Sequence, residues 1–180
     1  ITRKDGIQSF DVIRKGHEAL CSIPHRGGMS SEGVGDGAGV NIDLSVEFFE
    51  AITGQELTAG LFGVGNFFMP DDSSRVDEAH ELISRELSAA GLDVLVIRDV
   101  PVDNSAARPA AAAYQLPIAQ WVFRAPEGWD RAKTDAAANQ ALLAIESIAY
   151  TEEHLRGLYP LSLSARTQVL KGRLLSLIHI

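Results

Sequence analysis

The sequence has a single cysteine, few basic residues and no long hydrophobic run, and each shortage excludes a class of protein. Cys21 is the only cysteine among 180 residues, so no internal disulfide can form, which favours a reducing, cytoplasmic location. Lys and Arg number 16 against 24 Asp and Glu, and the formal net charge of −8 argues against a protein that binds nucleic-acid backbones. No apolar run approaches the roughly 20 residues of a membrane-spanning helix, so no membrane association is expected.

Helical and strand patterns alternate along the chain, in which 46% of the residues are hydrophobic. Helices are predicted from Ser9 to Pro24, from Ser45 to Gly54, over 71–91 and over 130–148, with Ser9 and Ser45 as N-caps. Strands are predicted over 38–44, 61–70, 92–102 and 116–125, and 158–167 is predicted to form a hairpin with 168–175. The strands within 61–69 and 92–97 are apolar on both faces, which favours a layered sandwich over an open antiparallel sheet. The glycines of the strand at 61–70 indicate that other groups approach its backbone closely.

The segment HRGGMSSEGVGDGAG, residues 25–39, holds six glycines between a predicted helix and a predicted strand. A phosphate-binding loop would have to open a helix, and this segment precedes a strand, so nucleotide binding is disfavoured. A metal site on His17 and His25 lacks a third ligand nearby. From the residues alone, the simplest interpretation is a structural turn in which the glycines allow positive φ and Arg26 pairs with a carboxylate.

Several separate segments share their order with one known family. They are HRGG at 25–28, GDGAG at 35–39, FF at 48–49, GVGNFFMP at 63–70 and RDVP at 98–101. Near the end of the chain, the spacing S-x-S-x-x-T and KG-x-L occurs at Ser162, Ser164, Thr167, Lys171, Gly172 and Leu174. Together these segments resemble the class II glutamine amidotransferase domain of the glutamate synthase large subunit, from Ile1 to about Leu175.

The resemblance implies an α+β fold of the N-terminal-nucleophile hydrolase type, a four-layer αββα sandwich that is expected here to be incomplete at both ends. Residues 1–175 would form a partial glutamine amidotransferase domain. Residues 176–180 depart from the family and are predicted to be a tail outside it. In the family the nucleophile is a cysteine at the mature N-terminus.

This chain has Ile1 where its resemblance to the family begins, so the nucleophilic cysteine is expected upstream of Ile1 and no catalytic residue is predicted within the chain. A polypeptide limited to these residues is therefore expected to be inactive. Cys21 is not a substitute, because it lies on a predicted helical stripe beside Leu20 and Ile23, where cysteine usually serves as a small hydrophobic residue.

Arg26 is the residue that the resemblance assigns to substrate binding. Its guanidinium could hold the carboxylate of glutamine through two parallel hydrogen bonds. An alternative stays open, in which Arg26 braces the glycine loop through Asp36. The resemblance makes the surrounding residues a pocket wall or loop support: His25, Gly27, Gly28, Asp36, Gly37 and Gly39. No metal site is predicted.

The family's chemistry implies further partners. Ammonia released from L-glutamine would combine with 2-oxoglutarate in other domains of the large chain. There FMN and an iron–sulfur cluster would carry electrons supplied by a small subunit. None of these cofactors is expected on residues 1–180. Two alternatives remain open: another class II amidotransferase, of purine or asparagine biosynthesis, and a catalytically silent binding module with the same fold.

Overall fold

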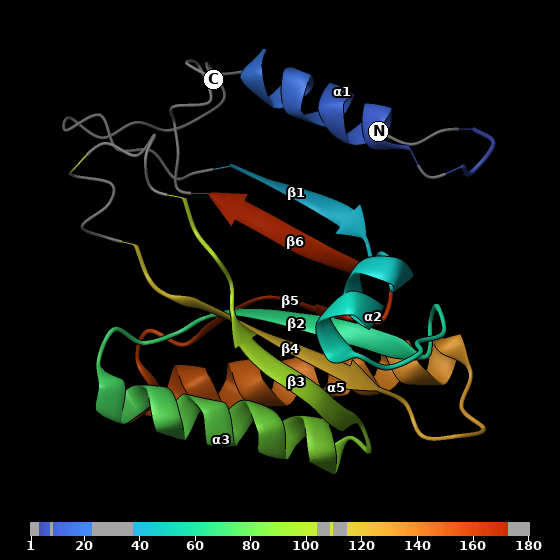
Figure 1. The fold of residues 1–180 in the computed structure, drawn as a ribbon. Helices are drawn as coiled ribbons and strands as arrows, with labels where there is room; N and C mark the ends of the chain where they lie inside the picture. The colour runs from blue at the N-terminus through green and yellow to red at the C-terminus, as the bar shows by residue number, and fades with distance from the viewer. Residues whose placement is uncertain (1–3, 8, 23–37, 104–108, 110–114, 173–180) are drawn as a thin grey trace. The chain divides into compact units, whose positions relative to one another are not determined.

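The computed structural model describes residues 4–7, 9–22, 38–103, 109 and 115–172 (Figure 1). The chain divides into two compact units. The first comprises Ile1–Ile42, Val102–Gln115 and Leu170–Ile180, and the second comprises Asp43–Pro101 and Leu116–Val169. The predicted boundary between residues 175 and 176 lies outside the described residues and stays a prediction.

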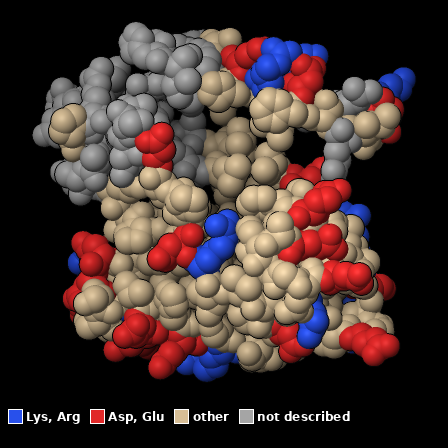
Figure 2. Space-filling model, viewed as in Figure 1, with Lys and Arg blue, Asp and Glu red and all other residues tan. Residues whose placement is uncertain are grey.

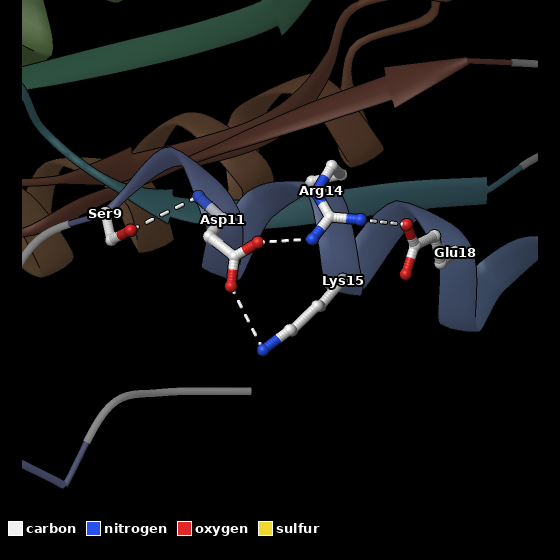
Figure 3. A network of polar contacts seen from close by, with 5 residues as sticks. All are labelled: Ser9, Asp11, Arg14, Lys15 and Glu18. Atoms are coloured by element: carbon white, nitrogen blue, oxygen red, sulfur yellow. Dashed lines mark hydrogen bonds and ion pairs between the residues drawn. The ribbon is translucent and has the colours of Figure 1, made fainter.

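The first unit contains helix α1 (Phe10–Cys21), which begins where the sequence predicts. The hydroxyl of Ser9 caps it by accepting a hydrogen bond from the backbone N–H of Asp11 at 3.3 Å (Figure 3). The carboxylate of Asp11 also forms ion pairs with Arg14 and Lys15, and Arg14 forms a second ion pair with Glu18. These cationic partners, Arg14 first and then Lys15, lower the pKa of Asp11 below its ordinary value.

A four-stranded antiparallel sheet forms the centre of the second unit. Its strands are β2 (Phe62–Phe68), β3 (Asp93–Asp99), β4 (Ile118–Arg124) and β5 (Tyr159–Ser164), in the order β3-β4-β2-β5. Successive side chains of a strand point to opposite faces, so each strand contributes to two layers. All four strands lie within segments that the sequence predicts as strands.

Helices α3 (Ser73–Ala89) and α5 (Arg131–Thr151) lie side by side on one face of this sheet (Figure 1). Asp72 and Asp130 cap their N-termini through side-chain hydrogen bonds. The core beneath them includes Trp121 and Phe123, both fully buried. The indole N–H of Trp121 donates to Ser84 at 3.2 Å, so its polar atom is satisfied inside the core.

Helix α2 (Val46–Thr53) covers part of the opposite face of the sheet. Ser45 caps it, and Gly54 ends it in the left-handed conformation with φ 67°, both as predicted. A second apolar cluster forms here from Leu44, Phe49, Phe62, Val64 and Val122. Both faces of β2 are therefore buried, which confirms the inference drawn from its apolar sequence. The same inference for 92–97 is wrong, because β3 lies at an edge of the sheet and none of its residues is fully buried.

The predicted hairpin is wrong, because its two strands belong to different sheets. β5 pairs with β2 in the four-stranded sheet, whereas β6 (Thr167–Gly172) pairs with β1 (Ala38–Asp43) in a two-stranded sheet. Both strand segments were predicted, but a short connection between two strands does not determine their partners. The side chains that direct the chain from one sheet to the other come from distant parts of the sequence and are described below.

Candidate functional site

The structure describes only some of the predicted site residues. His25, Arg26, Gly27, Gly28, Asp36 and Gly37 lie outside the described residues. Gly39 is described, and it is an exposed residue near the start of β1. Cys21 is the last residue of α1. The roles predicted for the glycine segment therefore stay predictions.

The two glycines of the GVG segment lie where no side chain fits. A Cβ atom on Gly63 would lie 2.3 Å from Cζ of Phe123 and 2.7 Å from the carbonyl oxygen of Ser164. A Cβ on Gly65 would lie 2.6 Å from Cε2 of Phe67. The glycines thus let rings from their own and the adjacent strand pack directly against the backbone of β2, which confirms the close approach predicted from the sequence.

The FF and RDVP segments meet on the α2 side of the sheet. Phe49 is fully buried, while Phe48 is half exposed and meets it edge-on at a ring distance of 5.1 Å. Arg98, from β3, holds its guanidinium carbon 6.0 Å from the centre of the Phe48 ring. A cationic side chain therefore lies between the apolar cluster under α2 and the polar groups further along β3 and β4.

Those polar groups form a network of buried amides, which we call the amide network: Asn66, Gln120 and Gln168, each at most 6% exposed. The side-chain amide of Gln120 donates to Asn66 at 2.8 Å and lies 3.4 Å from the side-chain oxygen of Gln168. Arg98 donates to the other end of Gln120 at 2.9 Å. The network crosses β3, β4 and β2 and reaches β6, so it connects four strands through side chains alone.

Replacing Gln120 by leucine is expected to lower the free energy of unfolding by about 1–3 kcal/mol, because Asn66 and Arg98 would lose a buried hydrogen-bond partner. Urea unfolding followed by circular dichroism measures this. The same change at Gln140, an exposed residue of α5, is the matched control and should alter stability by no more than about 0.5 kcal/mol. Equal effects at the two positions would show that the amide network contributes nothing specific.

The S-x-S-x-x-T segment turns the chain from β5 into β6. The hydroxyl of Ser162 accepts a hydrogen bond from the N–H of Val169 at 3.0 Å, and Asn66 donates to the carbonyl of Val169 at 3.2 Å. The hydroxyl of Ser164 accepts from the N–H of Arg166 and donates to the carboxylate of Asp135 on α5. Side chains of β2, β5 and α5 therefore fix the point at which β6 begins.

Sequence reasoning missed the amide network and the role of Asp135. A signal was present, since Asn66 and Gln120 interrupt the otherwise apolar segments GVGNFFMP and IAQWVF. A polar residue in a strand buried on both faces requires a partner. The partners lie 54 and 102 positions away from Asn66, so the sequence could indicate the requirement but not how it is met.

Three further findings concern the described part of the chain. It contains no group of three or more His, Cys, Asp or Glu side chains arranged to hold a metal ion. None of its helices combines the length and apolarity required to span a bilayer. On the face shown in Figure 2, carboxylates are spread over the surface of the described residues without a continuous basic patch.

Residues 1–178 match the family "Glutamine amidotransferases class-II". The chain belongs to this family, and its α+β structure agrees with the N-terminal-nucleophile hydrolase fold expected from the sequence. The buried glycines of β2, and the connection from β5 to β6 that Ser162 and Ser164 stabilise, are thus parts of an amidotransferase domain.

The similar proteins are glutamate synthases. The chain is 32% identical to ferredoxin-dependent glutamate synthase 1 of Arabidopsis thaliana, over 98% of the chain and 11% of that protein. It is 29% identical to the glutamate synthase [NADPH] large chain of Azospirillum brasilense, over 96% of the chain and 12% of that protein. The NADH enzyme of Schizosaccharomyces pombe is 28% identical over 94% of the chain. The chain therefore spans about a tenth of the length of the relatives it matches.

Proposed function

We propose that this chain is part of the ammonia-generating domain of a glutamate synthase large chain. The observation that carries the proposal is the match to the class-II family over residues 1–178, together with relatives that are all named as glutamate synthases. These names favour glutamate synthase over amidotransferases of purine or asparagine biosynthesis. The substrate would be L-glutamine, and the product ammonia would pass to 2-oxoglutarate to form glutamate.

The proposed reaction uses a cysteine immediately at the N-terminus of the parent domain, upstream of Ile1. Its α-amine, with an ordinary pKa of about 7.7–8.0, can accept the proton of its own thiol near neutral pH. The sulfur attacks the side-chain amide carbon of glutamine, the C–N bond breaks, and ammonia leaves with the transferred proton. Water then hydrolyses the glutamyl thioester and frees the thiol.

Arg26 would hold the α-carboxylate of glutamine, and the glycines of the same segment would let the backbone pass close to it. FMN, an iron–sulfur cluster and a small electron-supplying subunit would belong to the remaining domains and partners of the parent enzyme. The described side chains fix the two ends of the chain segment that connects β5 with β6.

The parent large chain provides the test. It should form glutamate from 2-oxoglutarate with either glutamine or ammonia as nitrogen source. Alkylation of its N-terminal thiol should abolish only the glutamine-dependent activity, because ammonia bypasses the thioester. An N-terminal residue other than cysteine, with no activity on glutamine, would favour a catalytically silent module of the same fold.

A polypeptide limited to Ile1–Ile180 is expected to release no ammonia from glutamine, because it would lack the cysteine proposed upstream of Ile1 and Cys21 is the last residue of helix α1. An ammonia assay on the purified polypeptide measures this, with Cys21→Ser as the matched variant. Ammonia release that disappears in Cys21→Ser would identify Cys21 as a nucleophile and contradict the proposed mechanism.

A further inference from the structure

A hollow opens on the second unit where the C-terminal end of α5 faces the start of β5. Leu143, Tyr150 and Tyr159 line it, with exposed fractions of 57%, 92% and 56%. Leu143 and Tyr150 stand on the same face of α5, since they are seven residues apart and a helix turns every 3.6 residues. The hollow therefore collects three large apolar side chains that the described residues leave in contact with water.

This arrangement differs from the rest of α5. The face toward the sheet is filled mainly by small residues, among them Ala137, Ala138 and Ala141, which allow close packing. Larger apolar side chains on the outer face contribute nothing to that core. Single exposed apolar residues are ordinary on protein surfaces, but a group of them around one hollow marks a binding surface.

The charged residues of the hollow determine what kind of partner fits. Glu146, Glu152 and Glu153 line it together with one cation, Arg156, so three negative charges and one positive give a net charge of −2. If a partner without positive charges buried these carboxylates, their loss of hydration would oppose binding. The complementary partner presents an apolar side chain flanked by lysine or arginine.

The backbone at this place does not favour the addition of another strand. β5 is one of the two outer strands of the four-stranded sheet within the described residues. Its second residue is Pro160, which has no N–H to offer to a neighbouring strand. Recognition at the hollow must therefore use side chains.

We propose that this hollow docks a basic, apolar segment of the same large chain, and the proposal rests on the function proposed above. Thirteen residues line the hollow, whereas a stable interface between separate proteins takes roughly 20–30 residues on each side. A segment of the same polypeptide is held at high effective concentration and can dock on a smaller surface. The relatives offer such a polypeptide, since this chain corresponds to about a tenth of their length.

Hydroxyl-radical footprinting of the full-length large chain tests the proposal, with oxidation of Tyr150 measured by mass spectrometry. Tyr150 should react about tenfold more slowly than in the unfolded chain, the ratio expected when the docked state dominates ten to one. The double variant Glu146→Lys, Glu153→Lys should remove this protection. The matched control is Glu127→Lys, an exposed position in the turn that precedes α5, which should retain the protection.

Oxidation of Tyr150 at the unfolded rate in the unaltered enzyme would overturn the proposal, and so would protection that survives the double charge reversal. Protection that disappears on dilution would show that a second copy or a separate subunit occupies the hollow, which would contradict docking by a segment of the same chain. Glutamine-dependent activity is measured on the same samples. If the unaltered enzyme showed no glutamine-dependent activity while Tyr150 was protected, the proposed function would be contradicted and the docking proposal would not.

Discussion

Replacement of Arg26 by alanine in the full-length enzyme is expected to lower kcat/KM for glutamine by roughly 100-fold or more. The proposed guanidinium–carboxylate pair consists of two charge-assisted hydrogen bonds, each worth about 1.5–3 kcal/mol, and 1.4 kcal/mol corresponds to a factor of ten. The loss should fall mainly on KM, because the α-carboxylate of glutamine is distant from the bond that breaks. Steady-state kinetics with glutamine as the varied substrate measures it.

Ammonia-dependent glutamate formation by the same variant is the internal control. That route bypasses the glutamine site, so it should be unchanged if Arg26 binds substrate. A parallel loss of both activities would instead assign Arg26 to the folding of the glycine segment, the alternative in which it pairs with Asp36. Unchanged activity with both nitrogen sources would remove Arg26 from the site altogether.

Replacement of Gly63 by alanine is expected to destabilise the fold by about 3 kcal/mol, at the upper end of the usual cost of overpacking. The added methyl group would meet the ring of Phe123, which is fully buried, and the carbonyl oxygen of Ser164, which belongs to the neighbouring strand. Neither can move without disturbing β4 or β5. Thermal unfolding followed by circular dichroism should show a midpoint lower by about 6–12 °C.

Gly16 provides the matched control for this change. It lies inside α1, a Cβ atom built on it has no neighbour within 4 Å, and its φ is not positive. Gly16→Ala should therefore raise the helical stability of α1 by about 0.5–1 kcal/mol. A Gly63→Ala protein as stable as Gly16→Ala would mean that β2 and its neighbours separate more easily than their packing indicates.

Local features of the sequence predicted most of the helices and strands. Ser9, Ser45 and Gly54 perform the capping roles assigned to them, because a cap depends on only a few adjacent residues. The apolar run of β2 correctly indicated a strand buried on both faces. The two glycines within that run indicated close approach, but only the fold shows that Phe123 and Phe67 occupy the space.

The pairing of strands was less accessible to sequence reasoning. β5 and β6 follow one another closely, and proximity alone favoured a hairpin. The actual course of the chain is set by Asp135, by Ser162 and by Asn66, which come from three different elements. Contacts between such distant residues depend on the whole topology, which a single sequence does not specify.

The features of the candidate site were likewise predictable where short sequence motifs indicate them and unpredictable where distant residues meet. Its family was recognisable because HRGG, GDGAG, GVG and RDVP occur in one order, and the match over residues 1–178 confirms that family. The role of Arg26 in binding glutamine stays a prediction, since residues 23–37 lie outside the described structure. The amide network around Gln120 was not predicted, although it is the most extensive buried polar feature described above.

The anchoring of Val169 by Ser162 and Asn66 has a consequence for how the chain folds as it is made. The N–H of Val169 bonds to Ser162 on β5, and its carbonyl bonds to Asn66 on β2, which precedes Val169 by about a hundred residues. The residues from β2 to Val169 must therefore all have left the ribosome before β6 can form these hydrogen bonds. Contacts of such sequence separation slow folding and prolong the exposure of unpaired strands. Nascent chains that stop before residue 169 should consequently depend more on chaperones than chains that extend beyond it.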